Sequence, residues 1–312
     1  MRRFDEFNVQ RSRFKVLAAL ATAGTLSIVA TAYQPPAAQP QGPRVIDMQK
    51  LKDNLYVLTS SSPADQATFS GGNVAVFITD SGVTVVDTKL AGWGQALLDK
   101  VKSVTNKPVT RIINTHTHGD HTGNNDLFGA TVDIVAHENT KANMAKMDAF
   151  KGEKAQFLPK KTFKDKLSLG SGKDRIDLYY FGAGHTSGDT FVVFPALRVL
   201  HTGDMFAWKD GPRCDLPNGG SCISYPQTLA KAVANIKDVD TVIPGHSPMQ
   251  TLKDLQEYQR FTADLSAHAQ AAMKSGRSVD DAFAAFKVDK YPGYKNERVK
   301  ASIQAVYDEM KK

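Results

Sequence analysis

Three histidines and one aspartate stand within six consecutive residues, in the stretch Asn-Thr-His-Thr-His-Gly-Asp-His-Thr-Gly at 114–123. Imidazole nitrogen and carboxylate oxygen are the ligands that borderline divalent metals such as zinc prefer. Four such groups on so short a loop cannot all face one ion, so we expect them to divide between two. His116 and His118 would bind one ion, and Asp120 and His121 would bind its neighbour. The alternative is a polar turn with solvated histidines, although turn chemistry alone seldom packs ligand types so densely.

The elements on either side must position this stretch. Residues 109–113 precede it and are typical of a short buried strand rich in β-branched side chains. A helix is expected to begin at Asp120, and Gly119 and Gly123 let the backbone turn sharply. The motif therefore lies at a junction between a strand and a helix.

Three later residues follow expected strands, each directly after a glycine. His185 lies in a glycine-rich turn between two strands, Asp204 follows the strand 198–201, and His246 follows the strand 241–243. Each alone would more often be an ordinary turn residue. A strand end followed by glycine and a ligand is nevertheless how a sheet presents side chains at one edge, so together these residues could complete a two-metal site.

The rest of the chain is rich in strands in its first part and helical in its last. Further strands are expected at 54–60, 73–79, 83–86, 132–136, 162–169, 175–181 and 190–194. Helices are expected at 95–104, from about 138, at 226–236, and from about 251 to the end with a break at 291–294.

The motif His-x-His-x-Asp-His, followed by a Gly-His, a Gly-Asp and a second Gly-His, resembles the metallo-β-lactamase-fold hydrolases, over about 51–250. The resemblance implies an α/β (α+β) fold, an αββα sandwich of two mixed sheets flanked by helices, here with a helical C-terminal extension. Within this family, the sequence resembles the glyoxalase II and lactonase-like general hydrolase branches more than typical zinc β-lactamases. Those β-lactamases typically carry cysteine at the position of Asp204, or lack the bridging carboxylate.

The resemblance also implies a ligand set. The first metal ion would be bound by His116, His118 and His185, the second by Asp120, His121 and His246, with Asp204 bridging both. Asp87 matches a family position that supports the site without binding metal. Two zinc ions are expected, although iron or manganese would also suit these ligands.

This ligand set predicts a metal-dependent hydrolase in which a metal-bound hydroxide cleaves an ester, thioester or lactone carbonyl of a small molecule. Asp120 would be catalytic, orienting the nucleophile and passing a proton to the leaving group. The main alternative is a metallo-β-lactamase that hydrolyses β-lactam antibiotics. A non-catalytic metal-binding protein is the alternative from another class.

The segment after Asp204 is expected to shape the substrate pocket. Phe206 and Trp208 could form an apolar wall, and Lys209 could meet a carboxylate. Tyr225 could donate a hydrogen bond to an oxyanion. Phe206 and Trp208 could equally belong to the core.

The N-terminal residues are typical of an export signal. Residues 1–32 combine a basic start, an apolar run and Ala30-Thr31-Ala32, a site for signal peptidase; a retained membrane anchor is the alternative. Residues 33–47 are expected to be a flexible linker and 48–312 the hydrolase domain. We therefore expect a periplasmic or secreted protein, without stable membrane insertion once the signal is removed.

The cysteines and the charge complete these expectations. The only two cysteines, Cys214 and Cys222, are close in a loop and are expected to form a disulfide in an exported protein. The formal charge of +7 includes +3 from residues 1–32, with five basic and two acidic groups, which leaves +4 over the other 280 residues. So mild a charge does not indicate nucleic-acid binding. The oligomeric state stays open.

Overall fold

The computed structural model describes residues 46–60, 65 and 67–312. The predicted signal peptide, and the predicted linker up to residue 45, lie outside the described residues. All described residues belong to one compact unit. Within the described part of the chain, no helix is both long and apolar enough to cross a membrane.

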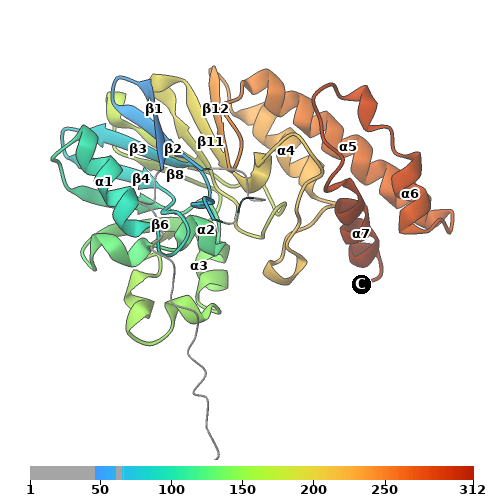
Figure 1. Cartoon of the computed structure of the whole chain (residues 1–312), viewed down its shortest axis with the longest axis horizontal. Helices are drawn as coiled ribbons and strands as arrows, with labels where there is room; N and C mark the ends of the chain where they lie inside the picture. Colours follow the sequence, from blue (N-terminus) through green and yellow to red (C-terminus); the bar gives the residue numbers. More distant parts are fainter. Residues whose placement is uncertain (1–45, 61–64, 66) are drawn as a thin grey trace, which may run out of the picture. The chain divides into compact units, whose positions relative to one another are not determined.

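Two β-sheets form the centre of the fold (Figure 1). The first sheet has the strand order β1-β2-β3-β4-β5-β6-β7, and the second has the order β12-β11-β10-β9-β8. The strands of the first sheet are β1 (Asp47–Lys52), β2 (Leu55–Thr59), β3 (Val74–Thr79), β4 (Gly82–Val86), β5 (Val109–Ile113), β6 (Asp133–His137) and β7 (Lys161–Phe163). Those of the second are β8 (Lys166–Leu169), β9 (Ile176–Tyr179), β10 (Phe191–Phe194), β11 (Val199–Gly203) and β12 (Thr241–Pro244).

Both sheets are mixed. In the first sheet, the pairs from β1 to β4 are antiparallel and the pairs from β4 to β7 are parallel. In the second sheet, the pairs from β8 to β11 are antiparallel and β11 pairs parallel with β12. The carboxyl ends of β4, β5 and β6 therefore meet at one edge of the first sheet, and those of β11 and β12 meet at one edge of the second.

Three apolar clusters define the layers. Phe77, Val86 and Ile113 of the first sheet pack against Phe194 and Val199 of the second. The opposite face of the first sheet packs against α1 (Gly94–Val104), and that of the second sheet against α4 (Tyr225–Asn235) and α5 (Leu252–Lys274). The result is the predicted αββα sandwich, since alternating strand residues bury side chains on both faces.

The helical C-terminal extension is present. After α5 come α6 (Val279–Ala285) and α7 (Val299–Met310), with α3 (Glu138–Met144) and the short α2 (Gly119–Thr122) completing the helices of the described residues. Side chains of α5, α6 and α7 join the cluster on the second sheet. The break between the last two helices is longer than predicted and spans 286–298, with a single 3₁₀ turn at Val288–Lys290.

Two expectations about strands are corrected. Strand β1 begins at Asp47, where the linker was expected to continue. The single strand expected at 162–169 is two strands, β7 and β8, which belong to different sheets. The chain crosses between the sheets at Lys164 and Asp165, whose backbone carbonyls accept hydrogen bonds from His137 and Tyr180.

Candidate metal centre

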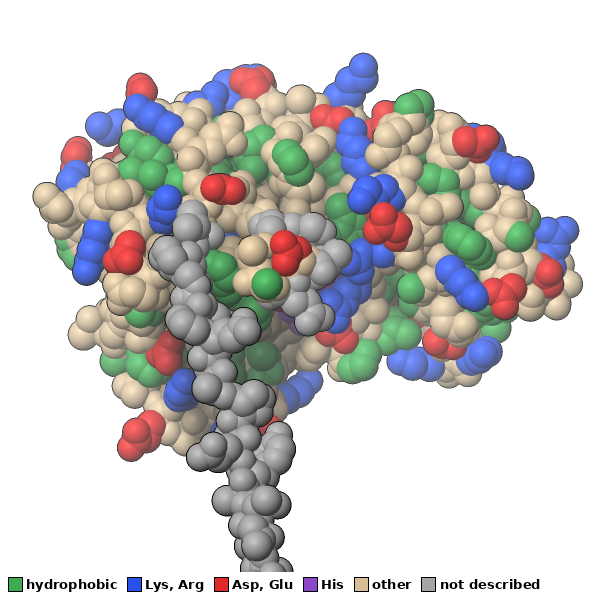
Figure 2. Space-filling view, viewed as in Figure 1, with side chains coloured by type: hydrophobic (Ala, Val, Ile, Leu, Met, Phe, Trp, Pro, Cys, Tyr) green, Lys and Arg blue, Asp and Glu red, His purple; other side chains and the backbone are tan. Residues whose placement is uncertain are grey.

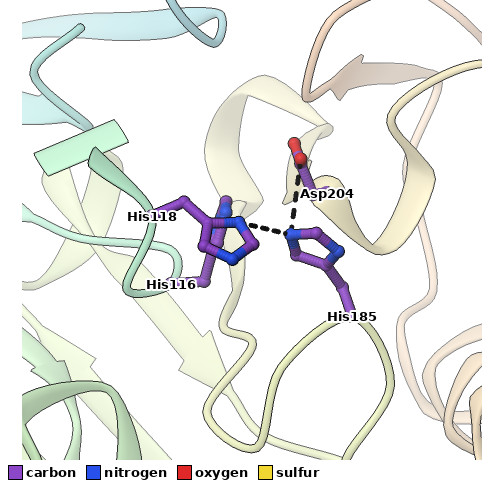
Figure 3. Close-up of side chains that lie close together, drawn as sticks. All are labelled: His116, His118, His185 and Asp204. Carbon is purple, nitrogen blue, oxygen red and sulfur yellow. Dashed lines mark hydrogen bonds and ion pairs between the residues drawn. The ribbon is translucent and has the colours of Figure 1, made fainter. Parts of the chain in front are cut away.

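The predicted ligands come together at the sheet edge. His116, His118, His185 and Asp204 form one group and Asp120, His121 and His246 a second, and within each group the potential ligand atoms lie within 4.8 Å of one another. The first group is drawn in Figure 3, where the three imidazoles and the carboxylate converge from three separate loops. These three loops follow β5, β9 and β11, and His246 of the second group follows β12.

Asp204 lies between the two groups. Its Oδ1 is 3.3 Å from His121 Nε2 and 3.2 Å from His246 Nε2, whereas its Oδ2 is 3.5 Å from His185 Nε2. The neighbouring histidines lower the pKa of this buried carboxyl well below its usual range, although burial alone would raise it. A carboxylate that stays ionised between both groups has the position a bridging ligand needs.

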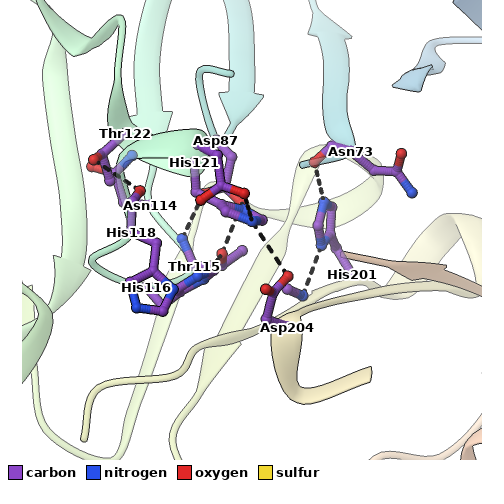
Figure 4. Close-up of polar contacts among 12 residues, drawn as sticks. Asn73, Asp87, Asn114, Thr115, His116, His118, His121, Thr122, His201 and Asp204 are labelled. Atoms are coloured by element: carbon purple, nitrogen blue, oxygen red, sulfur yellow. Dashed lines mark hydrogen bonds and ion pairs between the residues drawn. The ribbon is translucent and has the colours of Figure 1, made fainter. Parts of the chain in front are cut away.

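Hydrogen bonds fix which nitrogen of His116 and of His121 is free to bind (Figure 4). The hydroxyl of Thr115 donates to Asp87 Oδ2 at 2.7 Å, so it can only accept from His116 Nδ1, 3.0 Å away. His121 Nδ1 donates to the same Asp87 oxygen at 2.7 Å. In both residues Nε2 is therefore the nitrogen left for the site.

The other two histidines of the first group are oriented from the opposite side. His185 Nδ1 donates to the backbone carbonyl of Arg213 at 2.7 Å, which leaves Nε2 free. His118 Nε2 lies 2.6 Å from Asp215 Oδ2, so its Nδ1 is the atom that faces His185 Nε2, at 2.9 Å. Burial lowers the pKa of His185 to about 4, and this imidazole is neutral at neutral pH.

The arrangement fits a bound divalent cation. His116 Nε2 and His246 Nδ1 are buried and have no hydrogen-bond partner, and the buried Asp204 Oδ1 has only the ion-pair contacts with His121 and His246. Leaving a buried polar atom without a partner costs about 1–3 kcal/mol. His116 and Asp204 belong to the first group of ligand atoms, where a nitrogen- and oxygen-binding cation would satisfy both.

Two glycines allow the loops to approach this closely. A Cβ on Gly72 would lie 2.1 Å from Cε1 of His121, and one on Gly245 would lie 1.9 Å from Oδ1 of Asp204. Both distances are shorter than any carbon contact, so either substitution must displace a residue of the centre.

Asn73 and His201 hold the second sheet in register with the first (Figure 4). The Asn73 amide donates to the carbonyls of Pro244 and Ser247, on either side of His246. His201 Nε2 donates to the Asn73 carbonyl at 3.1 Å, and its Nδ1 accepts from Gly203 N, next to Asp204. These buried bonds fasten two predicted ligands to the start of β3.

The residues expected to line the pocket have different places. Trp208 and Lys209 line a cavity of about 430 Å³ that reaches His246. The Lys209 ammonium lies 2.6 Å from Asp254 Oδ1, so this ammonium already forms an ion pair within the chain.

Phe206 and Tyr225 do not line this cavity, which corrects the expectation that they face substrate. Phe206 is fully buried and stacks on Tyr258, and the Tyr225 hydroxyl donates to the backbone carbonyl of Asp204. Both residues support the turn after β11 from within the core.

Asp215 was missed by the sequence analysis, although it lies beside the predicted disulfide. Cys214 and Cys222 are joined by a disulfide, and the loop that they close carries Asp215 to His118, 97 positions away in sequence. Asn218 Nδ2 donates to the same Asp215 oxygen at 2.7 Å. No local pattern signals such a contact.

Comparisons with known proteins agree with this architecture. Residues 67–246 match the family model of the metallo-beta-lactamase superfamily. The chain is 29% identical over 231 residues to a metallo-beta-lactamase type 2 of Elizabethkingia meningoseptica, covering 69% of this chain and 87% of the relative. It is 26% identical over 204 residues to a metallo-beta-lactamase type 2 of Bacteroides fragilis, covering 64% and 79%.

Solved structures show the same fold. A metallo-beta-lactamase from Pontibacter korlensis superposes with a TM-score of 0.59 at 20% identity, covering 70% of this chain and 99% of that one. The metallo-beta-lactamase DIM-1 superposes with a TM-score of 0.58 at 21% identity, covering 70% and 97%.

Proposed function

Because the chain belongs to the metallo-beta-lactamase superfamily and is a metal-dependent hydrolase of that fold, we propose that it binds two divalent ions and cleaves an ester, thioester or lactone carbonyl. The observation that carries the proposal is Asp204, whose two oxygens face both groups of predicted ligands. The proposed ligands are His116, His118 and His185 for one ion and Asp120, His121 and His246 for the other, with Asp204 shared. Zinc suits these donors best, and iron or manganese would also suit them.

Two bound ions would polarise the substrate carbonyl and lower the pKa of a bound water toward neutrality. The chain's residues provide the rest. Asp120 is the most exposed of the seven, with 24% of its side chain accessible, whereas the side chains of His121 and Asp204 are 0% and 7% accessible. Its Oδ2 also lies 3.4 Å from His246 Nε2. It can therefore orient a water, accept its proton and transfer that proton to the leaving group.

A second candidate function is β-lactam hydrolysis. It is favoured by the names of the two relatives described above, which are called metallo-beta-lactamases. Asp204 supports the first candidate, since typical zinc β-lactamases carry cysteine at this position or lack the bridging carboxylate.

One experiment separates the two candidates. The mature protein loaded with zinc is assayed against an aryl ester, a thioester, a lactone and a penicillin, with Asp204→Ala as the control for the metal centre. We expect turnover of the ester or lactone to exceed that of the penicillin. Efficient penicillin hydrolysis would instead support the second candidate, and no turnover of any carbonyl substrate would contradict both.

We also propose that the protein is exported, a proposal supported by the disulfide between Cys214 and Cys222. Cleavage after Ala32 would give a mature chain that begins at Tyr33. N-terminal sequencing of the protein recovered outside the cytoplasm tests this. Recovery of the full chain in the cytoplasm would contradict it.

A further inference from the structure

The C-terminal extension returns to the candidate active site. The segment between α6 and α7 is fastened to the segment that follows Asp204, since Lys295 N donates to the Lys209 carbonyl and Arg298 N donates to Asp210 Oδ1. The hydroxyl of Ser302, in α7, donates to the Pro212 carbonyl. Residues 293–298 thereby supply one wall of the 430 Å³ cavity that His246 lines from the opposite side. This wall lies outside the residues that match the family model.

Within this cavity a guanidinium is stacked on an aromatic ring. Arg298 Cζ lies 3.9 Å from the centroid of the Trp208 ring, and the Trp208 ring lies 5.5 Å from the ring of His246. A guanidinium held this closely over an indole is oriented in advance, because the cation is attracted to the ring face. Arg298 is half-buried and lines the cavity.

Arg298 differs from the other cations of the cavity. Lys209 pairs with Asp254 at 2.6 Å, and Lys295 pairs with Glu297 at 3.3 Å. In the described part of the chain, no carboxylate lies within 4.0 Å of the half-buried Arg298 guanidinium, and no hydrogen bond engages it. The carboxyl of Asp210 accepts the backbone N–H groups of Gly211 and Arg298 instead.

We propose that Trp208 and Arg298 form a receptor for a carboxylate that the substrate carries apart from the carbonyl that is hydrolysed. This inference rests on the proposed function. The planar guanidinium matches a carboxylate with two parallel hydrogen bonds. A single negative charge suits the cavity, because Arg298 is its one cation without an ion pair among the described residues. Lys and Arg side chains gather near the junction between the sheets and the C-terminal helices (Figure 2), which would attract such an acid from solution.

The test compares two matched substrates, the 4-nitrophenyl monoester of glutaric acid and its methyl ester, which lacks the free carboxylate. For Arg298→Ala we expect KM for the acid to rise about 10- to 100-fold, with kcat little changed, because a charge-assisted hydrogen bond is lost. KM for the methyl ester should stay within about twofold of the unsubstituted protein. Arg298→Lys should retain part of the preference. Lys295→Ala, on the same segment, is the control and should leave the preference intact.

A second readout does not depend on turnover. The chain has two tryptophans, and the other one, Trp93, is buried in the cluster with α1. Titration with pentanoate, a monocarboxylate that cannot be hydrolysed, should therefore change the fluorescence of Trp208, and Arg298→Ala should abolish the saturable change. Equal effects of Arg298→Ala on acid and methyl ester, or pentanoate binding that is unaffected, would overturn the receptor. If no ester is hydrolysed but pentanoate binds through Arg298, the proposed function fails and the receptor stands.

Discussion

Replacing Asp215 should weaken the binding of the first metal ion more than that of the second. Asp215 Oδ2 lies 2.6 Å from His118 Nε2, and both side chains are mostly buried. This bond turns Nδ1, the predicted ligand atom of His118, toward the other members of the first group. In Asp215→Ala the imidazole loses both its orientation and its preferred tautomer. His116 and His185 keep their own hydrogen bonds to Thr115 and to the Arg213 carbonyl.

The magnitude follows from the role of such partners. Loss of a residue that orients a metal ligand typically costs 10- to 100-fold in metal affinity, which is about 1.4 to 2.7 kcal/mol. We expect Asp215→Ala to lie in this range. Asp215→Asn should cost less, because the amide oxygen can still accept from Nε2 although the negative charge is gone.

Competition with a chromophoric chelator measures both dissociation constants in one titration. The control is Asp240→Asn, which removes an exposed carboxylate that pairs with the exposed Arg198 and not with any predicted ligand. The reasoning is refuted if Asp215→Ala leaves both constants within a factor of two. It is also refuted if binding of the two ions is weakened equally. Among the predicted ligands, Asp215 contacts His118 through its side chain and the His185 carbonyl through its backbone N–H, and both belong to the first group.

Four further outcomes are expected. Elemental analysis should give close to two metal ions per chain, and Asp204→Ala should loosen both, so metal content unaffected by that change would argue against a shared ligand. Asp120→Asn should lower kcat by about 100-fold or more with a smaller change in KM, as for loss of a group that transfers a proton; a change in KM alone would contradict this role. Burial alone would lower the pKa of His121, but the carboxylates around it, Asp204 foremost, raise it well above its usual value. The metal-free protein should then release a proton on binding metal at pH 7, and affinity at this site should rise with pH by up to about tenfold per unit below that pKa; calorimetry in buffers of different ionisation enthalpy detects this, and metal uptake without proton release would contradict it. Intact mass should increase by two protons on reduction of Cys214 and Cys222, whereas two alkylatable thiols in the native exported protein would contradict the bond.

The sequence was most informative where chemistry and secondary structure coincide along the chain. Residues 109–123 place a strand, a turn and four potential ligands in one continuous pattern, and β5 has the predicted bounds. Asp204 and His246 could be placed because each follows a strand that ends at a sheet edge, and β11 and β12 prove to be parallel neighbours. In such cases the local pattern alone determines where a side chain points.

Contacts between distant segments could not be predicted in this way. The bond between His118 and Asp215 and the stacking of Arg298 on Trp208 each join positions about 90 or more residues apart, and neither leaves a periodic signal. The crossing at Lys164 was missed because β7 and β8 together have the alternation of one longer strand. The burial of Phe206 was undecidable from sequence, since an aromatic residue after a strand suits a pocket and a core equally well.

The disulfide between Cys214 and Cys222 can form only after the chain meets an oxidant, so it separates two stages in the life of the protein. While the thiols are reduced, Asp215 lies on a loop held by hydrogen bonds alone, and His118 depends on that loop. Newly made chains in a reducing compartment should therefore acquire metal poorly and remain inactive. With the export proposed above, oxidation would act as a maturation step that precedes metal binding, and activity would begin only after the protein leaves the reducing compartment.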